Sequence, residues 1–258
     1  MARNRALDTA SGEYIAFMDP DDWYPHENVL RDLYNIATEN NVEICGGSLC
    51  EYERGKGIVT VLNESRSKCT FLNNGFILFF DYQFDYNYQR FIFRRDFLNR
   101  NKLRFLEYRR FQDPPFFVEA MIAAQKFYSV NNVTYCYRVN AKPVEWTEEK
   151  LAHPALGLGD ILKITSYSRL KELHAVELER VSNIYFRRFE DALPDSKGSL
   201  LQALERLCDL ADLSLIDNRQ DLTKCLQALR TQIRKKRILD PDFQDDRLLP
   251  IRRIEFPK

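Results

Sequence analysis

The sequence has no long hydrophobic run. None of its 258 residues belongs to an apolar stretch approaching the ~20 residues that a helix needs to cross a bilayer. The first residues also lack the apolar core of a secretory signal peptide. These absences predict a soluble, cytoplasmic protein. The basic segment at 233–239, IRKKRIL, leaves open a peripheral contact with the inner face of the membrane, although cations at a helix end also complement the helix dipole.

Residues that bind zinc or build catalytic triads are few and scattered. The three histidines, at positions 26, 153 and 174, form no metal or triad spacing, and neither GxSxG nor a P-loop occurs. The six cysteines contain no CxxC pair, so we predict free, buried thiols in a reducing compartment. They are Cys45, Cys50, Cys69, Cys136, Cys208 and Cys225.

An excess of charge of either sign is also missing. Lysine plus arginine equals aspartate plus glutamate, at 38 each. No global field therefore points to nucleic acid as a partner, and electrostatic recognition has to be local.

An acidic segment early in the chain carries the strongest signal. Glu13–Met18 reads EYIAFM, an apolar run of strand length, and Asp19, Asp21 and Asp22 follow it directly. A helix is expected next, over 26–40, because a proline precedes it and apolar residues recur on one face. In an open α/β fold this order places the carboxylates at the carboxyl edge of a sheet.

Two interpretations of these acids stay open on spacing alone. Clustered carboxylates repel one another, and a divalent cation would compensate that repulsion. Oxygen ligands favour Mg²⁺ or Mn²⁺ over zinc. Aspartate and proline are also ordinary turn formers, however, and Asp22 could simply cap the next helix.

Residues 2–25 resemble the middle of the catalytic domain of family 2 glycosyltransferases, which usually reads close to ARNxGxxxAxGEYIxFxDxDDxxxP. This chain reads ARNRALDTASGEYIAFMDPDDWYP. The resemblance implies an α/β glycosyltransferase-A fold with a mixed sheet flanked by helices. It also implies that Asp19 and Asp21 hold Mn²⁺ or Mg²⁺ against the diphosphate of a nucleotide-sugar, most commonly a UDP-sugar. Arg3 and Asn4 would face the donor nucleotide.

A second, weaker match covers IFRRDFLNRNKLRF, RRFQDPPFFVEAMIAA and VTYCYRVN, between residues 92 and 140. By position, the resemblance makes Asp113 the general base that an inverting transfer needs. Arg94 and Gln112 would contact the acceptor, with Gln112 replacing an acid that relatives often carry. Two prolines and an apolar run follow Asp113, so we also predict that it is the N-cap of a helix.

The chain is predicted to be α/β over 1–145 and helical over 146–258. Trp146 would either line the acceptor side or act as a hydrophobic anchor that closes the domain, and we favour the anchor. The loop 81–89, DYQFDYNYQ, could stack on a sugar or pack on the domain surface. The other predicted strands are 42–52, 58–62, 90–94 and 128–139. The last of these could instead be a hairpin that turns at Asn131-Asn132. The predicted helices are 3–10, 73–80, 113–127, 156–193, 199–216 and 221–239, and the segment 73–80 could instead be a strand.

The resemblance begins in the middle of the family's domain. Its opening strands, which bind the base and ribose of the donor, have no counterpart in this sequence, so we expect an amino-terminally truncated form. A sheet without those strands would present an unpaired apolar edge, through which two copies could form a homodimer.

We therefore predict an inverting, metal-dependent glycosyltransferase. It would move a sugar from a nucleotide-sugar to a glycan or lipid-linked acceptor in cell-surface polysaccharide synthesis. The alternative is a catalytically silent carbohydrate-binding or interaction module. A helical scaffold with a Ca²⁺-binding acidic loop is a third, weaker hypothesis.

Overall fold

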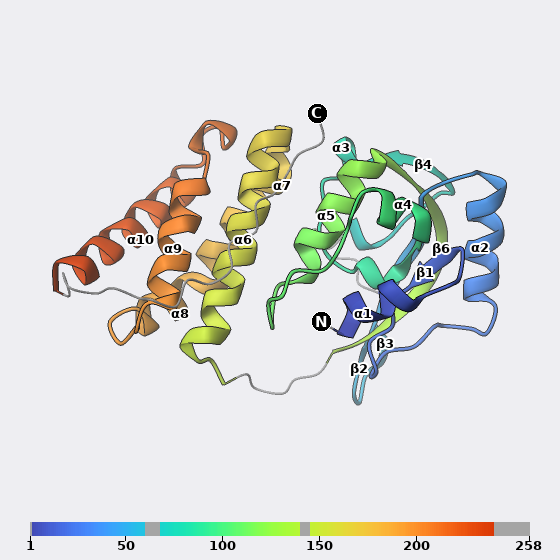
Figure 1. The fold of residues 1–258 in the computed structure, drawn as a ribbon, viewed down its shortest axis with the longest axis horizontal. Coiled ribbons are helices and arrows are strands. Elements are labelled where there is room, and N and C mark those ends of the chain that lie inside the picture. Colours follow the sequence, from blue (N-terminus) through green and yellow to red (C-terminus); the bar gives the residue numbers. More distant parts are fainter. Residues whose placement is uncertain (1, 60–67, 140–144, 240–258) are drawn as a thin grey trace. The chain divides into compact units, whose positions relative to one another are not determined.

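A computed structural model describes residues 2–59, 68–139 and 145–239. The described chain forms two units (Figure 1). The α/β unit comprises residues 1–107 and 112–144, and the helical unit comprises 108–111 and 145–258. The prediction had placed the short segment 108–111 with the α/β part.

The α/β unit is built on a mixed sheet with the strand order β1-β5-β2-β6-β4, and β3 pairs with β2. Among the described strands, β2 and β6 are parallel neighbours and the other pairs are antiparallel. The strands are β1 (Tyr14–Ala16), β2 (Ile44–Glu53), β3 (Gly57–Val59), β4 (Gly75–Leu78), β5 (Phe91–Arg94) and β6 (Lys126–Val139). The helices of this unit are α1 (Ala2–Thr9), α2 (Val29–Glu39), α3 (Phe79–Tyr82), the 3-10 turn η2 (Tyr88–Arg90), α4 (Arg95–Arg100) and α5 (Asp113–Ala124).

Two predicted elements of this unit are different in the structure. The segment predicted as a helix at 73–80 forms strand β4 followed by the short helix α3, so the strand alternative was right for its first part. The segment 128–139 is not a hairpin, because β6 runs through Asn131-Asn132 and absorbs extra residues there as shifts in register against β2. Gly47 permits this approach, since a Cβ atom there would lie 2.4 Å from the Asn132 carbonyl oxygen.

The core of the α/β unit is aromatic. Phe17, just after β1, contacts the rings of Phe93, Phe105 and Phe116 edge to face, with centroids 5.2 to 5.9 Å apart. Phe105 and Phe116 stack at 4.0 Å. Such rings bury large apolar area and fix their neighbours geometrically. They give the loop that follows Phe17 a rigid base.

The helical unit contains the remaining elements, which are α6 (Glu148–Ser168), α7 (Lys171–Arg180), the π-helical turn η3 (Val181–Tyr185), α8 (Phe186–Ala192), α9 (Ser199–Leu210), the 3-10 turn η4 (Leu213–Leu215) and α10 (Gln220–Leu239). The predicted helix 156–193 is thus divided, because the chain turns at Arg169 in a left-handed conformation. Thr147 caps α6 by accepting from the Lys150 amide. Glu148 ties α6 to α9 by accepting from the Gly198 and Leu200 amides at the start of α9.

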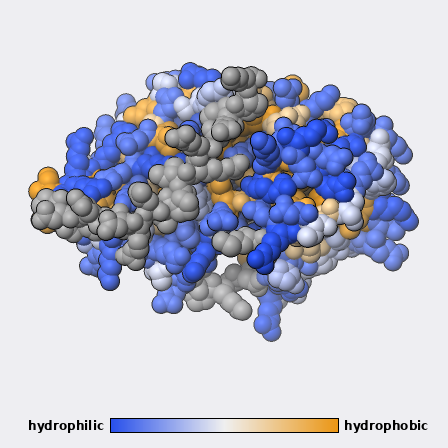
Figure 2. All heavy atoms as spheres, viewed as in Figure 1, coloured by the Kyte–Doolittle hydropathy of each residue, from blue (hydrophilic) through white to orange (hydrophobic). Residues whose placement is uncertain are grey.

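The surface is mainly hydrophilic on the face drawn in Figure 2, with hydrophobic residues in small patches. Among the described helices, none is long and apolar enough to cross a membrane. Two of the basic residues in 233–239 have partners within the helical unit. Arg237 pairs with Glu205 at 2.7 Å, and Lys236 donates to the Pro194 carbonyl at 2.9 Å.

Candidate functional site

The acidic loop follows β1 as the sequence predicted, and a tight turn shapes it. The Asp22 amide donates to the Asp19 carbonyl at 3.1 Å. The Asp19 carboxylate accepts from Arg3 at 2.9 Å through one oxygen and from Gln89 at 2.8 Å through the other. Its side chain remains 25% exposed, whereas the side chain of Asp21 lies at the exposed tip of the turn. Asp19 and Asp21 are therefore the acids of this loop that a ligand can reach.

Asp22 has a structural role instead. Its carboxylate accepts from the Tyr135 hydroxyl and from the Arg138 amide, both at 2.8 Å. The Tyr135 hydroxyl in turn accepts from the Asp19 amide at 3.1 Å, and Arg138 Nε donates to the Asp21 carbonyl at 2.9 Å. Asp22 does not cap α2, which begins at Val29 rather than near residue 26. Hydrogen bonds with Tyr135 and Arg138 of β6 thus hold the acidic loop in place.

Arg3 pairs with the acidic loop and lies on an aromatic surface. Its guanidinium lies over the rings of Tyr88 and Phe105, at 5.8 and 5.4 Å from their centroids. Burial lowers the pKa of Arg3, but the neighbouring Tyr88 and Asp19, and more weakly the charge of Asp113, raise it above its ordinary value. The ion pair of Arg3 is with Asp19, whereas Asp113 acts on Arg3 electrostatically, although the two acids are 94 residues apart in the chain (113 − 19).

Asp113 is the first residue of α5 rather than its N-cap. Gln112 occupies the cap position, and the two prolines follow Asp113 inside the first turn. Burial raises the pKa of the Asp113 carboxyl, and the charges of Asp19 and Asp85 raise it further, while a backbone hydrogen bond and the Arg3 charge oppose the rise. A carboxylate with a raised pKa, held at a rigid helix end, suits proton transfer.

Asn4 lies beside Arg3, but its side chain binds the protein itself. Its amide group donates to the Phe105 carbonyl at 2.8 Å and accepts from the Phe105 amide at 2.9 Å. These two bonds fix α1 to the segment that carries the Phe105 ring. The predicted contact of Asn4 with a donor nucleotide stays a prediction, and the observed geometry gives this residue a positioning role.

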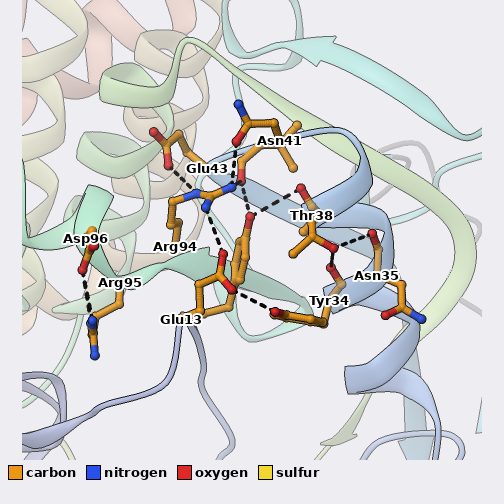
Figure 3. A network of polar contacts seen from close by, with 12 residues as sticks. Glu13, Tyr34, Asn35, Thr38, Asn41, Glu43, Arg94, Arg95 and Asp96 are labelled. Atoms are coloured by element: carbon orange, nitrogen blue, oxygen red, sulfur yellow. Dashed lines mark hydrogen bonds and ion pairs between the residues drawn. The ribbon is translucent and has the colours of Figure 1, made fainter.

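Arg94 lies away from the acidic loop. It pairs with Tyr14 at the start of β1, whereas the acids follow the end of that strand. Its guanidinium binds Glu13 and Glu43, each at 3.1 Å, and Asn41 at 3.1 Å (Figure 3). This network links β5 to the residues just before β1 and just before β2, its two neighbours in the sheet. Acceptor binding by Arg94 stays a prediction without support from its position.

Trp146 belongs to the helical unit. The guanidinium groups of Arg110 and Arg188 lie 5.2 and 5.3 Å from its ring, and the ring of Tyr185 meets it edge-on at 6.1 Å. Both roles predicted for Trp146, acceptor lining and domain anchor, stay predictions. Gln112, by contrast, precedes Asp113 directly and is partly exposed, so of the three predicted acceptor residues it is the one adjacent to the proposed base.

Sequence reasoning missed two residues that shape the site and gave a third another role. Gln89 and Tyr135 hold the Asp19 carboxylate and the backbone of the acidic loop, and Tyr88, considered for stacking on a sugar, lies beneath the Arg3 guanidinium. Tyr88 and Gln89 end the segment DYQFDYNYQ, which had been considered for stacking on a sugar. Most of its rings are buried instead, including those of Tyr82, Phe84 and Tyr88, so packing within the domain is the better description.

The donor set of the loop limits how a cation can bind. In the described parts of the chain, no group of three histidine, cysteine or acidic side chains is placed to hold a metal ion. Asp19 and Asp21 offer two carboxylates, whereas the Asp22 carboxylate already accepts hydrogen bonds from β6. Mg²⁺ is commonly bound by only one or two carboxylates together with substrate phosphates and water. Asp19 and Asp21 therefore fit a hard divalent cation if substrate phosphates and water supply its other ligands.

Comparison with known proteins adds three findings. Residues 1–100 match the sequence profile of the family described as glycosyl transferase family 2. The poly(ribitol-phosphate) beta-N-acetylglucosaminyltransferase TarP of Staphylococcus aureus strain N315 is 25% identical over 130 residues. That match covers 50% of this chain and only 37% of TarP.

The fold is similar to that of S. aureus TarS. The crystal structure of TarS 1-349 in complex with UDP-GlcNAc superposes with a TM-score of 0.61 at 18% identity, covering 93% of this chain and 70% of that one. A second crystal structure of TarS gives a TM-score of 0.61 at 17% identity, covering 98% of this chain and 44% of that one. At such low identity the likeness establishes the fold.

Proposed function

Because residues 1–100 form a glycosyl transferase family 2 domain, we propose that the chain takes part in inverting transfer of a sugar from a nucleotide-sugar to a polymeric acceptor. UDP-GlcNAc is the donor we propose, since TarS is described in complex with it. A poly(ribitol-phosphate)-type polymer is the acceptor we propose, from the name of TarP. The observation that carries the proposal is the partly exposed ion pair of Asp19 with Arg3 at 2.9 Å, with Asp113 electrostatically coupled to both.

Asp113 would act as the general base. It would accept the proton of an acceptor hydroxyl while that oxygen attacks the anomeric carbon and the bond to the diphosphate breaks. The surroundings of Asp113 suit this step, because its raised pKa strengthens it as a base and the Arg3 charge still favours the ionised form. Gln112, next to it, would orient the acceptor.

Asp19 and Asp21 would hold Mn²⁺ or Mg²⁺ beside the donor. A bound cation would offset the negative charge on the departing diphosphate. Arg3 is paired with Asp19 and 30% exposed, so it could add a second positive group toward the phosphates. Gln89 and β6 would keep the loop in place while the donor binds.

A binding module without catalysis is the alternative. It is favoured by one observation: both oxygens of Asp19 are already engaged, by Arg3 and by Gln89. If those contacts persist when a nucleotide-sugar binds, Asp19 would not be available to a metal. The predicted homodimer through a sheet edge and the predicted membrane contact are compatible with either function and stay predictions.

The test uses the chain with UDP-GlcNAc, Mn²⁺ and a ribitol-phosphate polymer. Calorimetry measures donor affinity, and release of UDP measures transfer. We expect Asp113→Asn to lower the transfer rate by ~10² to 10⁴-fold, the range for loss of a general base, with donor affinity nearly unchanged. Asp19→Asn should weaken metal-dependent donor binding instead.

Asp96→Asn is the matched control, because Asp96 is an exposed acid on α4 that pairs with the adjacent Arg95. It should leave both measurements unchanged. Metal-dependent donor binding without any transfer would support the binding module. Absence of donor binding both in this chain and in a longer form that restores the family's opening strands, or a fully active Asp113→Asn variant, would overturn the proposed function.

A further inference from the structure

Two buried cysteines face each other across the parallel pair of strands β2 and β6. Cys50 is directly paired with Cys136 in the strand register, and their Sγ atoms lie 2.6 Å apart. That separation is far inside van der Waals contact and close to the ~2.05 Å of a disulfide bond. The strand pairing already holds both Cβ atoms in neighbouring positions, so little backbone movement is needed to join the sulfurs.

Cys45 and Cys69 are placed differently. Cys45 lies on the same strand as Cys50 but packs with Val29 and Leu33 of α2. The Cys69 thiol donates to Asn87 at 3.4 Å. Burial of the thiols alone therefore does not explain why Cys50 and Cys136 face each other.

We propose that Cys50 and Cys136 are an oxidation site, which hydrogen peroxide converts to an intramolecular disulfide. Cys50 is 3% exposed and Cys136 is fully buried, so a small oxidant reaches the pair more readily than a bulky disulfide such as oxidised glutathione. This inference is independent of the transferase reaction.

The chemistry needs one peroxide molecule. The Cys50 thiolate attacks a peroxide oxygen, so that an S–O bond forms, the O–O bond breaks and the leaving hydroxide takes a proton to become water. The Cys136 sulfur then attacks the Cys50 sulfur, so that the S–S bond forms and the S–O bond breaks, and a second water leaves. Two thiols lose two electrons in total, and the peroxide gains them. The hydrogen bond with Cys136 lowers the pKa of Cys50, which suits Cys50 to the first step.

The position of the pair links it to the acidic loop. The Cys136 amide donates to the Trp23 carbonyl at 2.9 Å, and the Trp23 amide donates back at 3.3 Å. Tyr135, which holds Asp22 and the Asp19 amide, is the preceding residue. A Cys50–Cys136 bond would therefore cross-link the sheet at the point where β6 supports that loop.

The test exposes the full native chain to hydrogen peroxide, quenches it, alkylates the thiols under denaturing conditions and maps the peptides without reduction. We expect the number of free thiols to fall from six to four (6 − 2), with one cross-linked peptide pair containing Cys50 and Cys136. Dithiothreitol should restore six. Because this mapping uses the unchanged chain, it does not depend on whether a variant folds.

Two variants sharpen the test. Cys45→Ala, a buried cysteine on the same strand, should still form the link, whereas Cys50→Ala should abolish it. Retention of all six thiols, conversion of Cys50 to a sulfinic acid without a link, or a link that involves another cysteine would each overturn the proposal.

Discussion

The two units hold their paired carboxylates differently. In the α/β unit, Asp19 pairs with Arg3, Asp113 acts on the same cation electrostatically, and both Asp19 and Arg3 remain partly exposed. In the helical unit, Asp160 pairs with Arg206 at 2.5 Å and Glu177 pairs with Arg180 at 2.6 Å, with both acids almost fully buried.

This difference concerns how much of each ion pair solvent can reach. A partly exposed acid beside a second acid keeps negative charge that a metal ion or a proton could satisfy. A buried acid with its own arginine has no such excess, and removing its partner is costly. The contrast supports the proposal of ligand binding at Asp19 and a structural role for the buried pairs of the helical unit.

Removal of a structural cation should give the largest effect on stability. Arg206→Met leaves Asp160 buried without its arginine, although the Tyr108 hydroxyl still donates to it at 2.9 Å. We expect a loss of about 3 to 5 kcal/mol in the free energy of unfolding, measured with urea, with donor affinity unchanged. Arg187→Met, in an exposed pair with Glu190, is the control and should cost less than about 1 kcal/mol. Equal costs for the two variants would break the comparison.

A pH titration should reveal the contribution of a buried hydrogen-bond network around His174 to the stability of the helical unit. His174 Nε2 accepts from the Asp212 amide at 3.1 Å, so its ring is neutral, and Nδ1 lies 2.7 Å from the Thr165 hydroxyl oxygen. Burial lowers the pKa of His174 to about 4, from about 6.5 in the unfolded chain. The unfolded state therefore binds the extra proton between these values, and stability falls as the pH drops from about 6.5 to 4.

The expected loss over that interval is about 3 kcal/mol, from urea unfolding at a series of pH values. His174→Gln should reduce this pH dependence, whatever its own cost at pH 7; burial also lowers the pKa of His153, which adds a slope of the same sign. The control is His26→Gln, which changes an exposed histidine of the α/β unit and should keep the slope. An unchanged slope in His174→Gln would show that His174 is not the group that titrates there.

Asn4→Ala tests whether a polar residue of the α/β unit serves stability rather than donor binding, and its expected effect is smaller. It removes two hydrogen bonds to the backbone of Phe105, which is 2% exposed, so we expect a loss of about 1 to 3 kcal/mol in stability. Donor affinity at moderate temperature should change little. Asn35→Ala on the exposed face of α2 should be nearly neutral in stability. A stable Asn4→Ala variant with tenfold weaker donor binding would instead give Asn4 the donor contact that the resemblance implies.

Much of the architecture was predictable from local pattern. The apolar run before Asp19, the periodicity of α2 and α5 and the change to helices after residue 145 each depend on residues close together in the chain. The errors occurred where local patterns were ambiguous. The run FILFF suits a strand or a helix, and pairing with β6 made its first part a strand. Asn131-Asn132 suits a hairpin turn, but alignment with β2 kept the strand continuous.

The sequence by itself determined which groups are present at the acidic loop and in what order, because a strand, three aspartates and a helix are adjacent along the chain. Tertiary structure alone decided how those groups are used. It bonded the Asp22 carboxylate to Tyr135, and it placed both Gln89 and Arg3 within hydrogen-bond distance of the Asp19 carboxylate. The physical reason is that hydrogen bonds and charges act over a few ångströms in space, whatever the separation along the chain.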